Sequence, residues 1–290
     1  MKKVSIITPS FNQGNYIEKT ILSVLDQSYT SIEYIIIDGG STDITIDIIK
    51  KYEKHIDYWV SEPDNGQADA INKGIIRATG ELIAWVNSDD ILYKDFIEKR
   101  VDEFNVNPGL DMIYGDVEQG PHFDIKVTRK GRQTSFNEML LTGNIPIPQQ
   151  SCVFTKDILE KVGFLNPNYN VLLDRDLFMR IAYFGKIKYT AGVTGFFLNH
   201  EDSKSILLEI EWIKEYEIYY KWLFDQFLDR SYKKFRNKAY SNMFGRCAVI
   251  SFNNSRYLLF FRYIIMSTLR NPARGIKYML KSLMQKRTHG

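Results

Sequence analysis

The sequence predicts an α/β fold in which helices flank a mostly parallel sheet, with a helical extension at the carboxyl end. Over the first hundred residues, short β-branched runs alternate with segments of helical periodicity. Repetition of strand, helix and strand indicates parallel strands joined by right-handed crossovers. Beyond residue 205 the pattern is helical and rich in aromatic residues. We therefore expect a sheet domain over residues 1–205 and a basic, aromatic-rich helical region over residues 206–290.

Four runs in the first part indicate buried strands, because each is an almost continuous stretch of apolar residues. They are Val4–Thr8, Tyr34–Asp38, Tyr58–Ser61 and Leu82–Asn87. Apolar stripes at helical spacing separate them, over residues 17–25, 44–49 and 68–76. Ligands of parallel sheets bind beyond the carboxyl ends of the strands. The polar stretches that follow the four strands, TPSFNQG, DGGSTD, SEPDNGQ and NSDD, are therefore expected to converge on one rim.

The middle of the chain, residues 110–200, is less regular. DMIYGDV and KIKYTAGVTGFFL are typical of strands, and short helices are expected near Lys156 and Asp176. We expect this segment to extend the sheet and to build a cleft for a second substrate.

Bulk composition favours an intracellular globular protein. With 290 residues the chain is long enough for a full-sized core. Its two cysteines, Cys152 and Cys247, lack the spacing of a zinc site or a disulfide framework, which favours the cytoplasm. The apolar run before Pro9 is too short for an export signal, and no apolar segment reaches the length of a spanning helix.

The net charge of +3 conceals a strong asymmetry. From Arg230 to the end there are 14 Lys and Arg and no Asp or Glu, so residues 1–229 carry 24 bases against 35 acids, a balance of −11. This division predicts an acidic body and a basic tail that meets an anionic surface. Nucleic acid is not expected as a partner, because the acidic body would repel its phosphates.

The NSDD stretch ends its strand with four oxygen-bearing side chains, Asn87, Ser88, Asp89 and Asp90. Carboxylate and carbonyl oxygens are the ligands that Mg²⁺ and Mn²⁺ prefer. A metal site is therefore expected at this strand end. Asp90 has an alternative role as the N-cap of the following helix.

The segments VSIITPSFNQGNYIEKTILSVLDQSY, EYIIIDGGSTD, DNGQADAINKG and NSDD, in this order, resemble the inverting, nucleotide-sugar-dependent glycosyltransferases of family 2, which have the GT-A (Rossmann-like) fold. The resemblance covers about residues 3–205. The first loop lacks the GxGxxG spacing of a dinucleotide-binding dehydrogenase. The resemblance implies metal-dependent transfer of a sugar from a nucleoside diphosphate sugar, with UDP as the expected nucleotide. The acceptor is expected to be a hydroxyl of a glycan or a lipid-linked molecule in bacterial surface polysaccharide biosynthesis.

The resemblance also implies a set of donor-binding residues. They are Thr8, Pro9, Ser10 and Asp38 around the nucleoside, Asp64, Gly66, Gln67, Asn72 and Lys73 beside the donor sugar and diphosphate, and Asn87 and Ser88 at the metal. Asp38 has a structural alternative as a turn residue, because Asp-Gly is common in turns. Lys73 has one as a solvated residue of a helix face.

Metal ligation is expected mainly from Asp89, with Mg²⁺ or Mn²⁺ as the cofactor. Asn87 stands where the family often has the first acid of its DXD motif, and it brings no charge. His200, in FFLNHEDSKS, matches a late family segment that closes on the diphosphate or metal, with Ser203 and Ser205 nearby. The alternative for His200 is a solvated loop residue.

The catalytic base implied by the resemblance is Asp174, in NVLLDRDLFMRI. Leu173 replaces the Glu that the family usually has before it. From the residues alone, a helix N-cap is the favoured interpretation of Asp174. Asp176 and Arg180, four apart, are expected to form an intrahelical ion pair.

Two other classes of function stay open at this point. The departures at Asn87 and Leu173 allow a catalytically degenerate module that binds nucleotide sugars. A sugar nucleotidyltransferase is less favoured, because TPSFNQG has no Lys or Arg for a triphosphate.

The helical region is expected to make two kinds of contact. Its basic residues from Arg256 onward favour a peripheral contact at the cytoplasmic face of the inner membrane. Its aromatic residues are expected to pack against the catalytic body or a second subunit of a homodimer. They are Trp212, Tyr216, Tyr219, Trp222 and Phe224.

Overall fold

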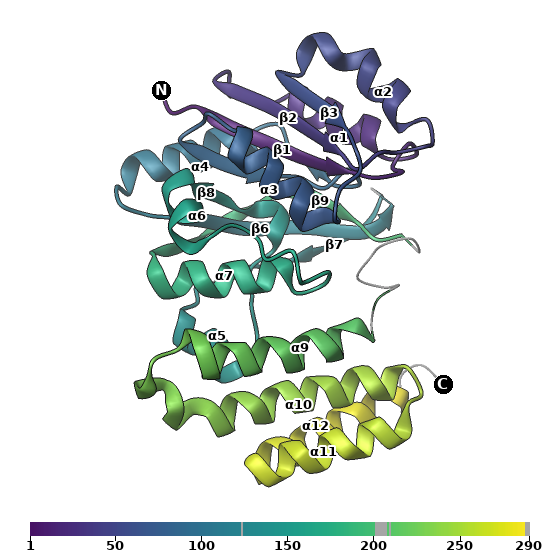
Figure 1. The fold of residues 1–290 in the computed structure, drawn as a ribbon, viewed down its shortest axis with the longest axis vertical. Helices are drawn as coiled ribbons and strands as arrows, with labels where there is room; N and C mark the ends of the chain where they lie inside the picture. The colour runs from purple at the N-terminus through teal and green to yellow at the C-terminus, as the bar shows by residue number, and fades with distance from the viewer. Residues whose placement is uncertain (123, 201–207, 209, 288–290) are drawn as a thin grey trace. The chain divides into compact units, whose positions relative to one another are not determined.

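The computed structural model describes residues 1–122, 124–200, 208 and 210–287 (Figure 1). The chain divides into two compact units. Unit 1 contains residues 1–135 and 146–200, and unit 2 contains residues 136–145 together with the described residues after 200. The expected domain boundary at residue 205 lies outside the described residues. The excursion of the chain into unit 2 at residues 136–145 was not anticipated from the sequence.

Unit 1 is built on one sheet, of which nine strands lie in the described residues. They are β1 (Val4–Ser10), β2 (Ile32–Asp38), β3 (Tyr58–Ser61), β4 (Leu82–Trp85), β5 (Ile91–Leu92), β6 (Met112–His122), β7 (Ile125–Arg129), β8 (Val153–Thr155) and β9 (Ile187–Leu198). Their order is β3-β2-β1-β4-β8-β6-β9-β5, with β7 paired to β6. The first four strands run parallel, as predicted, and the α/β fold class is confirmed. The middle segment extends the sheet but adds antiparallel pairs at β8, β7 and β5.

Helices cover both faces of this sheet (Figure 1). In unit 1 they are α1 (Ile17–Leu25), α2 (Thr45–Tyr52), α3 (Gln67–Arg77), α4 (Phe96–Val106), α6 (Lys156–Val162) and α7 (Leu173–Phe184), with short 3-10 turns at Glu53–His55 and Gln149–Ser151. Buried residues of α1, α2 and α4 form one core cluster with alternate residues of the strands, such as Val4 and Ile6 of β1. On the other face Trp85 stacks on Phe154, which stacks on Phe178 of α7.

Local sequence explains where the site-bearing helices begin and end. Gly66 precedes α3 with φ 100°, a backbone conformation that only glycine adopts without strain. Thr155 caps α6 by accepting a hydrogen bond from the Ile158 N–H, and Gly163 ends that helix in the left-handed region. These residues therefore determine where α3 begins and where α6 begins and ends.

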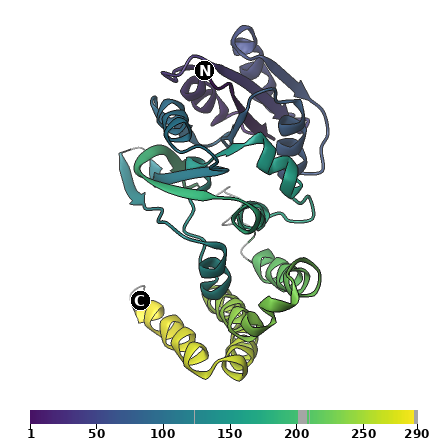
Figure 2. The same ribbon diagram turned by 90° about the vertical axis from the view of Figure 1, so that its left-hand side faces the viewer.

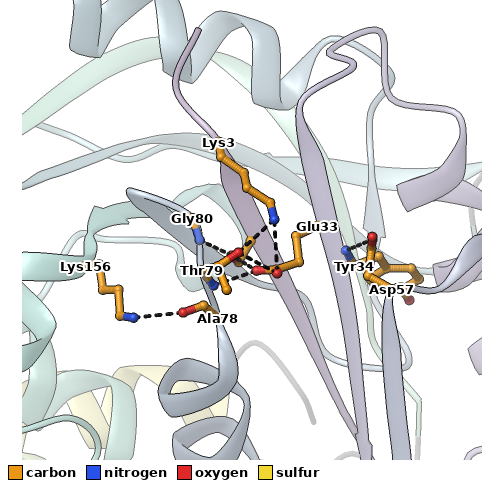
Figure 3. Close-up of polar contacts among 9 residues, drawn as sticks. Lys3, Glu33, Tyr34, Asp57, Ala78, Thr79, Gly80 and Lys156 are labelled. Atoms are coloured by element: carbon orange, nitrogen blue, oxygen red, sulfur yellow. Dashed lines mark hydrogen bonds and ion pairs between the residues drawn. The ribbon is translucent and has the colours of Figure 1, made fainter.

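The amino ends of the central strands are joined by a carboxylate, Glu33 of β2 (Figure 3). Its carboxylate accepts hydrogen bonds from the Ser5 hydroxyl, the Thr79 N–H and hydroxyl, and the Lys3 amine. Burial alone would raise the pKa of Glu33, but the bonds from Ser5, Thr79 and Lys3 outweigh it and lower the pKa to about 2. Strands β1, β2 and the start of β4 are thus locked together at this end.

Unit 2 is helical. Its described elements are α5 (Phe136–Thr142), α9 (Glu211–Trp222), a π-helical turn (Leu223–Phe227), a 3-10 segment (Arg230–Phe235), α10 (Arg236–Asn253), α11 (Tyr257–Arg270) and α12 (Pro272–Arg287). Helices α10, α11 and α12 pack against one another, as Figures 1 and 2 show. None of the helices in the described part of the chain is both long enough and apolar enough to cross a membrane.

Polar and aromatic side chains hold unit 2 together. Asn242 of α10 donates a hydrogen bond to the Leu141 carbonyl at 2.5 Å and accepts one from Arg274 of α12, so a single residue links three helices. Aromatic rings fill the core around Tyr240, which contacts Tyr220 and Phe224. Tyr216, Tyr219 and Phe224 are buried, whereas Trp212 and Trp222 are only partly buried. The contacts around Tyr240 lie within unit 2, and the expected packing against the catalytic body or a second subunit stays a prediction.

Candidate active site

The carboxyl ends of β1, β2 and β3 lie in register at one edge of the sheet. Ser10 pairs with Asp38, and Asp38 pairs with Ser61. Thr8, Pro9 and Ser10, predicted to lie around a nucleoside, are all buried within β1. The Thr8 hydroxyl is 3.2 Å from the Tyr34 hydroxyl. The Ser10 hydroxyl, by contrast, has no hydrogen-bond partner in the described part of the chain.

Asp38 organises the loop after β2. Its Oδ2 accepts hydrogen bonds from the backbone N–H groups of Gly40 and Ser41 and from the Ser61 hydroxyl, at 2.7–3.0 Å. Its Oδ1 accepts one from the Ser41 hydroxyl at 2.6 Å. The side chain is fully buried. Asp38 therefore fixes the conformation of the loop after β2 through its hydrogen bonds.

The first two loops of the rim are tied to each other. The Asn12 N–H donates to the Ser41 hydroxyl at 2.7 Å, while the Asn12 side-chain oxygen accepts from the Thr42 N–H at 2.9 Å. Asp43 accepts from the Gly14 N–H at 2.9 Å and from the Thr45 N–H at 3.0 Å. These bonds connect the start of α2 to the loop that enters α1. Asp43 therefore links two loops of the rim.

The third loop carries Asp64 and Gly66 to the start of α3. Asp64 accepts a hydrogen bond from the Gly66 N–H at 2.7 Å, which fixes the turn. Gln67, the first residue of α3, donates to the Asn87 side-chain oxygen at 2.9 Å. The structure thus brings together two predicted donor residues from different loops.

Two further predicted donor residues on α3 are engaged with protein groups. Asn72 donates to the Leu165 carbonyl at 2.8 Å and accepts from the Leu165 N–H at 3.0 Å, which anchors the chain after α6. The Lys73 amine lies 2.9 Å from Glu62 and 3.8 Å from Asp69. Its hydrogen bond to Glu62 raises the pKa of Lys73.

Asn87 is the centre of a buried amide and carboxyl network below the NSDD turn. Its side-chain amide donates to Asp90 at 2.9 Å and to Gln149 at 3.4 Å. Gln150 also donates to Asp90, at 3.1 Å. Burial and the neighbouring Asp89 carboxylate raise the pKa of Asp90 well above its usual range. Asp90 does not cap the next helix, since α4 begins only at Phe96 and Asp90 faces this network instead.

Asp89, the residue before Asp90, contacts His200. The His200 Nε2 lies 3.0 Å from the Asp89 carboxylate, although 111 positions separate the two in sequence. The side chains are 11% and 20% exposed for His200 and Asp89 respectively. Tyr16, at the start of α1, packs its ring against the imidazole with centroids 4.5 Å apart. Ser88, also expected at the metal, is buried beside Asp89, while Ser203 and Ser205 lie outside the described residues.

Asp174 lies in the first turn of α7 and is half-buried. It accepts a hydrogen bond from the Arg175 N–H at 2.7 Å. Burial raises the pKa of Asp174, and the charges of Arg175 and Arg129 partly oppose this effect. The predicted Asp176–Arg180 ion pair is confirmed at 2.7 Å, with Arg180 also donating to two backbone carbonyls in the turn after α6.

Sequence reasoning missed some members of this site. Tyr16 gave no signal, because an aromatic residue before a helix usually packs into the core. Gln149 and Gln150 were not among the predicted site residues, and their link to Asn87 and Asp90 depends on β8 pairing beside β4. Asn87, which departs from the expected acid, is used here as an amide that bridges Gln67 and Asp90.

The residues at the rim fit a divalent cation that shares its ligands with a substrate. Asp89 and His200 offer a carboxylate and an imidazole side by side, and both are suitable for Mn²⁺. No group of three or more His, Cys, Asp or Glu side chains that could hold a metal is found among the described residues. Diphosphate oxygens and water would have to complete the shell, as is usual for Mg²⁺ and Mn²⁺ at phosphate sites.

A sheet whose parallel strands present such a rim, extended by antiparallel strands, is the architecture of the GT-A glycosyltransferases. The solved structures agree with this class. S. aureus TarS, in complex with UDP-GlcNAc, has a TM-score of 0.59 at 14% identity, covering 93% of this chain and 92% of that one. The mannosyltransferase PcManGT from Pyrobaculum calidifontis, in complex with GDP-Man and Mn²⁺, has a TM-score of 0.61 at 16% identity, covering 98% and 88%.

The chain belongs to glycosyl transferase family 2, whose family model matches residues 5–163. An uncharacterized glycosyltransferase of Mycobacterium tuberculosis is 30% identical over 191 residues, 62% of this chain and 68% of that protein. TuaG of Bacillus subtilis, a glycosyltransferase assigned to teichuronic acid biosynthesis, is 47% identical over 104 residues, 34% of this chain and 40% of its own. The protein is therefore a transferase enzyme of this family.

Proposed function

We propose that this protein transfers a sugar from a UDP-sugar to a hydroxyl of a glycan or lipid-linked acceptor, in a single displacement that inverts the anomeric centre. One observation carries the proposal: the direct contact between Asp89 and His200, which were expected to share a metal and lie 111 positions apart. The family establishes glycosyl transfer, and this contact supports the metal-dependent form of it. The TarS complex with UDP-GlcNAc supports the choice of nucleotide.

The donor would lie across the rim, with Asp89 and His200 at its diphosphate. A divalent cation bound by this pair would offset the negative charge that develops on the departing nucleoside diphosphate. Ser10 has a hydroxyl without a partner among the described residues, and it is suited to the nucleoside. Asp38 and Asn72 would act indirectly, by holding the loops that border the donor. Lys73 and the N–H groups at the start of α3 add positive potential for the diphosphate.

Asp174 would act as the general base. It would take the proton from the acceptor hydroxyl while that oxygen attacks the anomeric carbon, and the bond to the diphosphate oxygen would break in the same step. Its raised pKa makes it a stronger base than an ordinary Asp. One displacement at an α-linked donor gives a β-glycoside.

The proposed acceptor is inferred from one relative of the chain and from the charge of its carboxyl-terminal region. TuaG, a relative, is named as a glycosyltransferase of teichuronic acid biosynthesis, which supports a surface polysaccharide as the product. The 14 bases and no acids from Arg230 onward support an acceptor carried at an anionic membrane face. The basic region would hold the enzyme there by electrostatic attraction.

A donor screen tests the proposal. The protein is incubated with Mn²⁺ and each of several UDP- and GDP-sugars, and release of nucleoside diphosphate is measured with and without glycan acceptors. We expect release with a UDP-sugar, loss of release on chelation of the metal, and a β-linked product by nuclear magnetic resonance. An α-linked product from an α-linked donor would refute inversion. Binding of nucleotide sugar without any turnover would favour the degenerate module.

A further inference from the structure

Helix α11 in unit 2 has two apolar faces. Its buried face contains Phe260, Tyr263 and Ile264. The opposite face exposes four large apolar side chains at intervals of three and four residues, which places them on one side of the helix. They are Leu258, Phe261, Ile265 and Leu269, exposed by 90%, 58%, 58% and 81%. An aqueous surface helix would carry polar residues at these positions.

Helix α12 repeats the pattern beside it. Ile276, Leu280 and Met284 follow at intervals of four and are exposed by 50%, 47% and 64%. The two helices are closely packed, since Gly275 of α12 leaves no room for a side chain against Thr268 of α11. We call these seven exposed side chains on α11 and α12 the apolar stripes. Adjacent apolar stripes of this size on a described surface indicate a site of contact.

The charges around the apolar stripes indicate what makes that contact. Arg262 on α11 and Lys277 and Lys281 on α12 are exposed, each next in sequence to a stripe residue. The sequence from Arg230 to its end contains no acid that could neutralise them. Long basic side chains beside an apolar stripe can extend their charges to lipid headgroups while the stripe enters the acyl boundary. A second copy of the chain is a poorer match, because a two-fold interface would place the same bases opposite each other.

We propose that the apolar stripes of α11 and α12 insert into the interfacial layer of a membrane rich in anionic phospholipid, with both helices lying along its surface. The inference rests on the membrane contact given under the proposed function and deepens it. Basic residues supply attraction to the lipid headgroups, and the apolar stripes supply the depth of insertion. Binding then depends on both terms, and salt removes only the first.

The full-length protein is tested by co-sedimentation with vesicles of phosphatidylcholine alone and of phosphatidylcholine mixed with phosphatidylglycerol. We expect binding to the mixed vesicles, with part of it retained at high salt. The triple variant Leu258→Gln, Ile265→Gln, Leu269→Gln should bind at least about tenfold more weakly, because three aliphatic side chains no longer enter lipid. The matched control, Val106→Gln, Ile125→Gln, Val127→Gln, changes three exposed aliphatic residues of unit 1 and should bind as the unmodified chain does.

A second measurement reports insertion directly. Tryptophan placed by Phe261→Trp should be quenched by brominated phospholipids in mixed vesicles, whereas tryptophan placed by Ile125→Trp should not. Equal vesicle binding by the unmodified chain and the α11 triple variant would overturn the inference. So would a dimer in sedimentation velocity that the triple variant converts to monomer without any vesicle binding. Nucleoside diphosphate release with a soluble acceptor, measured on the same preparations, separates this failure from a failure of the proposed reaction.

Discussion

At the two ends of the parallel sheet in unit 1, buried carboxyl groups differ in their hydrogen bonding and in the direction of their pKa shifts. At the amino end, Glu33 accepts four hydrogen bonds, one of them from a lysine, and its pKa falls to about 2 (Figure 3). At the carboxyl end, Asp90 accepts two amide bonds on one oxygen, and the other oxygen has no hydrogen-bond partner among the described residues. Burial and Asp89 raise its pKa.

This difference indicates that one carboxyl group stabilises the fold and that the other belongs to a binding site. A fully bonded carboxylate favours the folded state, because its charged form is better solvated in the protein than in water. A carboxyl group left short of partners is a cost to the fold that a bound ligand can relieve. Ser10 and Gln150, at the same carboxyl end, also have buried oxygens without partners in the described residues. We call the hydrogen-bonded group of Glu33, Ser5, Thr79 and Lys3 at the amino end the clasp, because it stabilises the fold. The buried oxygens at the carboxyl end, which have no partners in the described residues, are instead suited to binding a ligand.

The largest effect is expected from Asp174→Asn. Loss of the proposed general base should lower kcat by about a thousandfold, within a range of about 10² to 10⁴. The variant should unfold at the same or a higher urea concentration than the unmodified protein, because burial disfavours the charge of Asp174. Steady-state kinetics and urea unfolding on one preparation check both parts. Loss of activity together with a large loss of stability would indicate a structural role instead.

Asp89→Ala should follow. Without its carboxylate the Asp89–His200 pair is lost, and we expect kcat/KM to fall by roughly a hundredfold with a weaker dependence on Mn²⁺. Isothermal titration of Mn²⁺ in the presence of UDP gives a readout that does not require turnover. The control is Asp95→Ala, which removes a surface carboxylate paired with Lys99. Unchanged Mn²⁺ affinity in Asp89→Ala would place the metal elsewhere.

Glu33→Gln should lower the stability of the folded protein and leave kcat unchanged. A folded pKa of about 2 against an ordinary value of 4.5 corresponds to roughly 3 kcal/mol of stability at neutral pH. Because the folded pKa is depressed, this contribution is present above pH 4.5 and is lost as the pH falls toward 2. Urea unfolding at several pH values should show the two proteins converging in acid.

Glu81→Gln is the control for this clasp, since Glu81 forms an exposed pair with Lys2 at 3.1 Å. We expect it to cost less than about 1 kcal/mol. A comparable loss in both variants would remove the distinction between the buried clasp and an ordinary surface pair.

The sequence was sufficient for one half of this comparison. Alternating strands and helices predict parallel strands, and parallel strands must bring TPSFNQG, DGGSTD and NSDD to one edge, as observed. Asp89, His200 and Asp174 could be named because a family resemblance supplied their roles. Asp176–Arg180 could be named because the spacing within one helix determines the contact.

The remainder depends on contacts between distant segments, which periodicity does not encode. Glu33 reads as the polar residue of a strand, and its partners Ser5 and Thr79 are 28 and 46 positions away. Gln149 and Gln150 reach Asn87 and Asp90 only because β8 runs antiparallel to β4. The departure from an acid at Asn87 is likewise explained only by the amide partners around it. Single-sequence patterns locate the elements and leave these partners open.

The pH dependence of the reaction should distinguish Asp174, whose pKa is raised, from Glu33, whose pKa is lowered. Asp174 must be ionised to act as a base, so kcat should be lost as the pH falls through a pKa that lies above the ordinary 3.8. Arg129 lowers this pKa by its charge, so Arg129→Gln should move the acid limb to higher pH. A limb that stays in place would show that another group sets it. Glu33→Gln, at the other end of the sheet, should leave the limb unchanged.

The smallest effects should come from two surface lysines, one at each end. Lys3 pairs with Glu33 at 3.2 Å and Lys73 pairs with Glu62 at 2.9 Å, and both are partly exposed. Either Lys→Gln change should cost less than about 1 kcal/mol of stability. Only Lys73→Gln should also raise the donor KM, by about threefold, because only Lys73 lies at the edge of the sheet that is proposed to bind the diphosphate. Equal KM values in the two variants would assign Lys73 to the solvated helix face, and the diphosphate would then be bound by Asp89, His200 and the N–H groups at the start of α3.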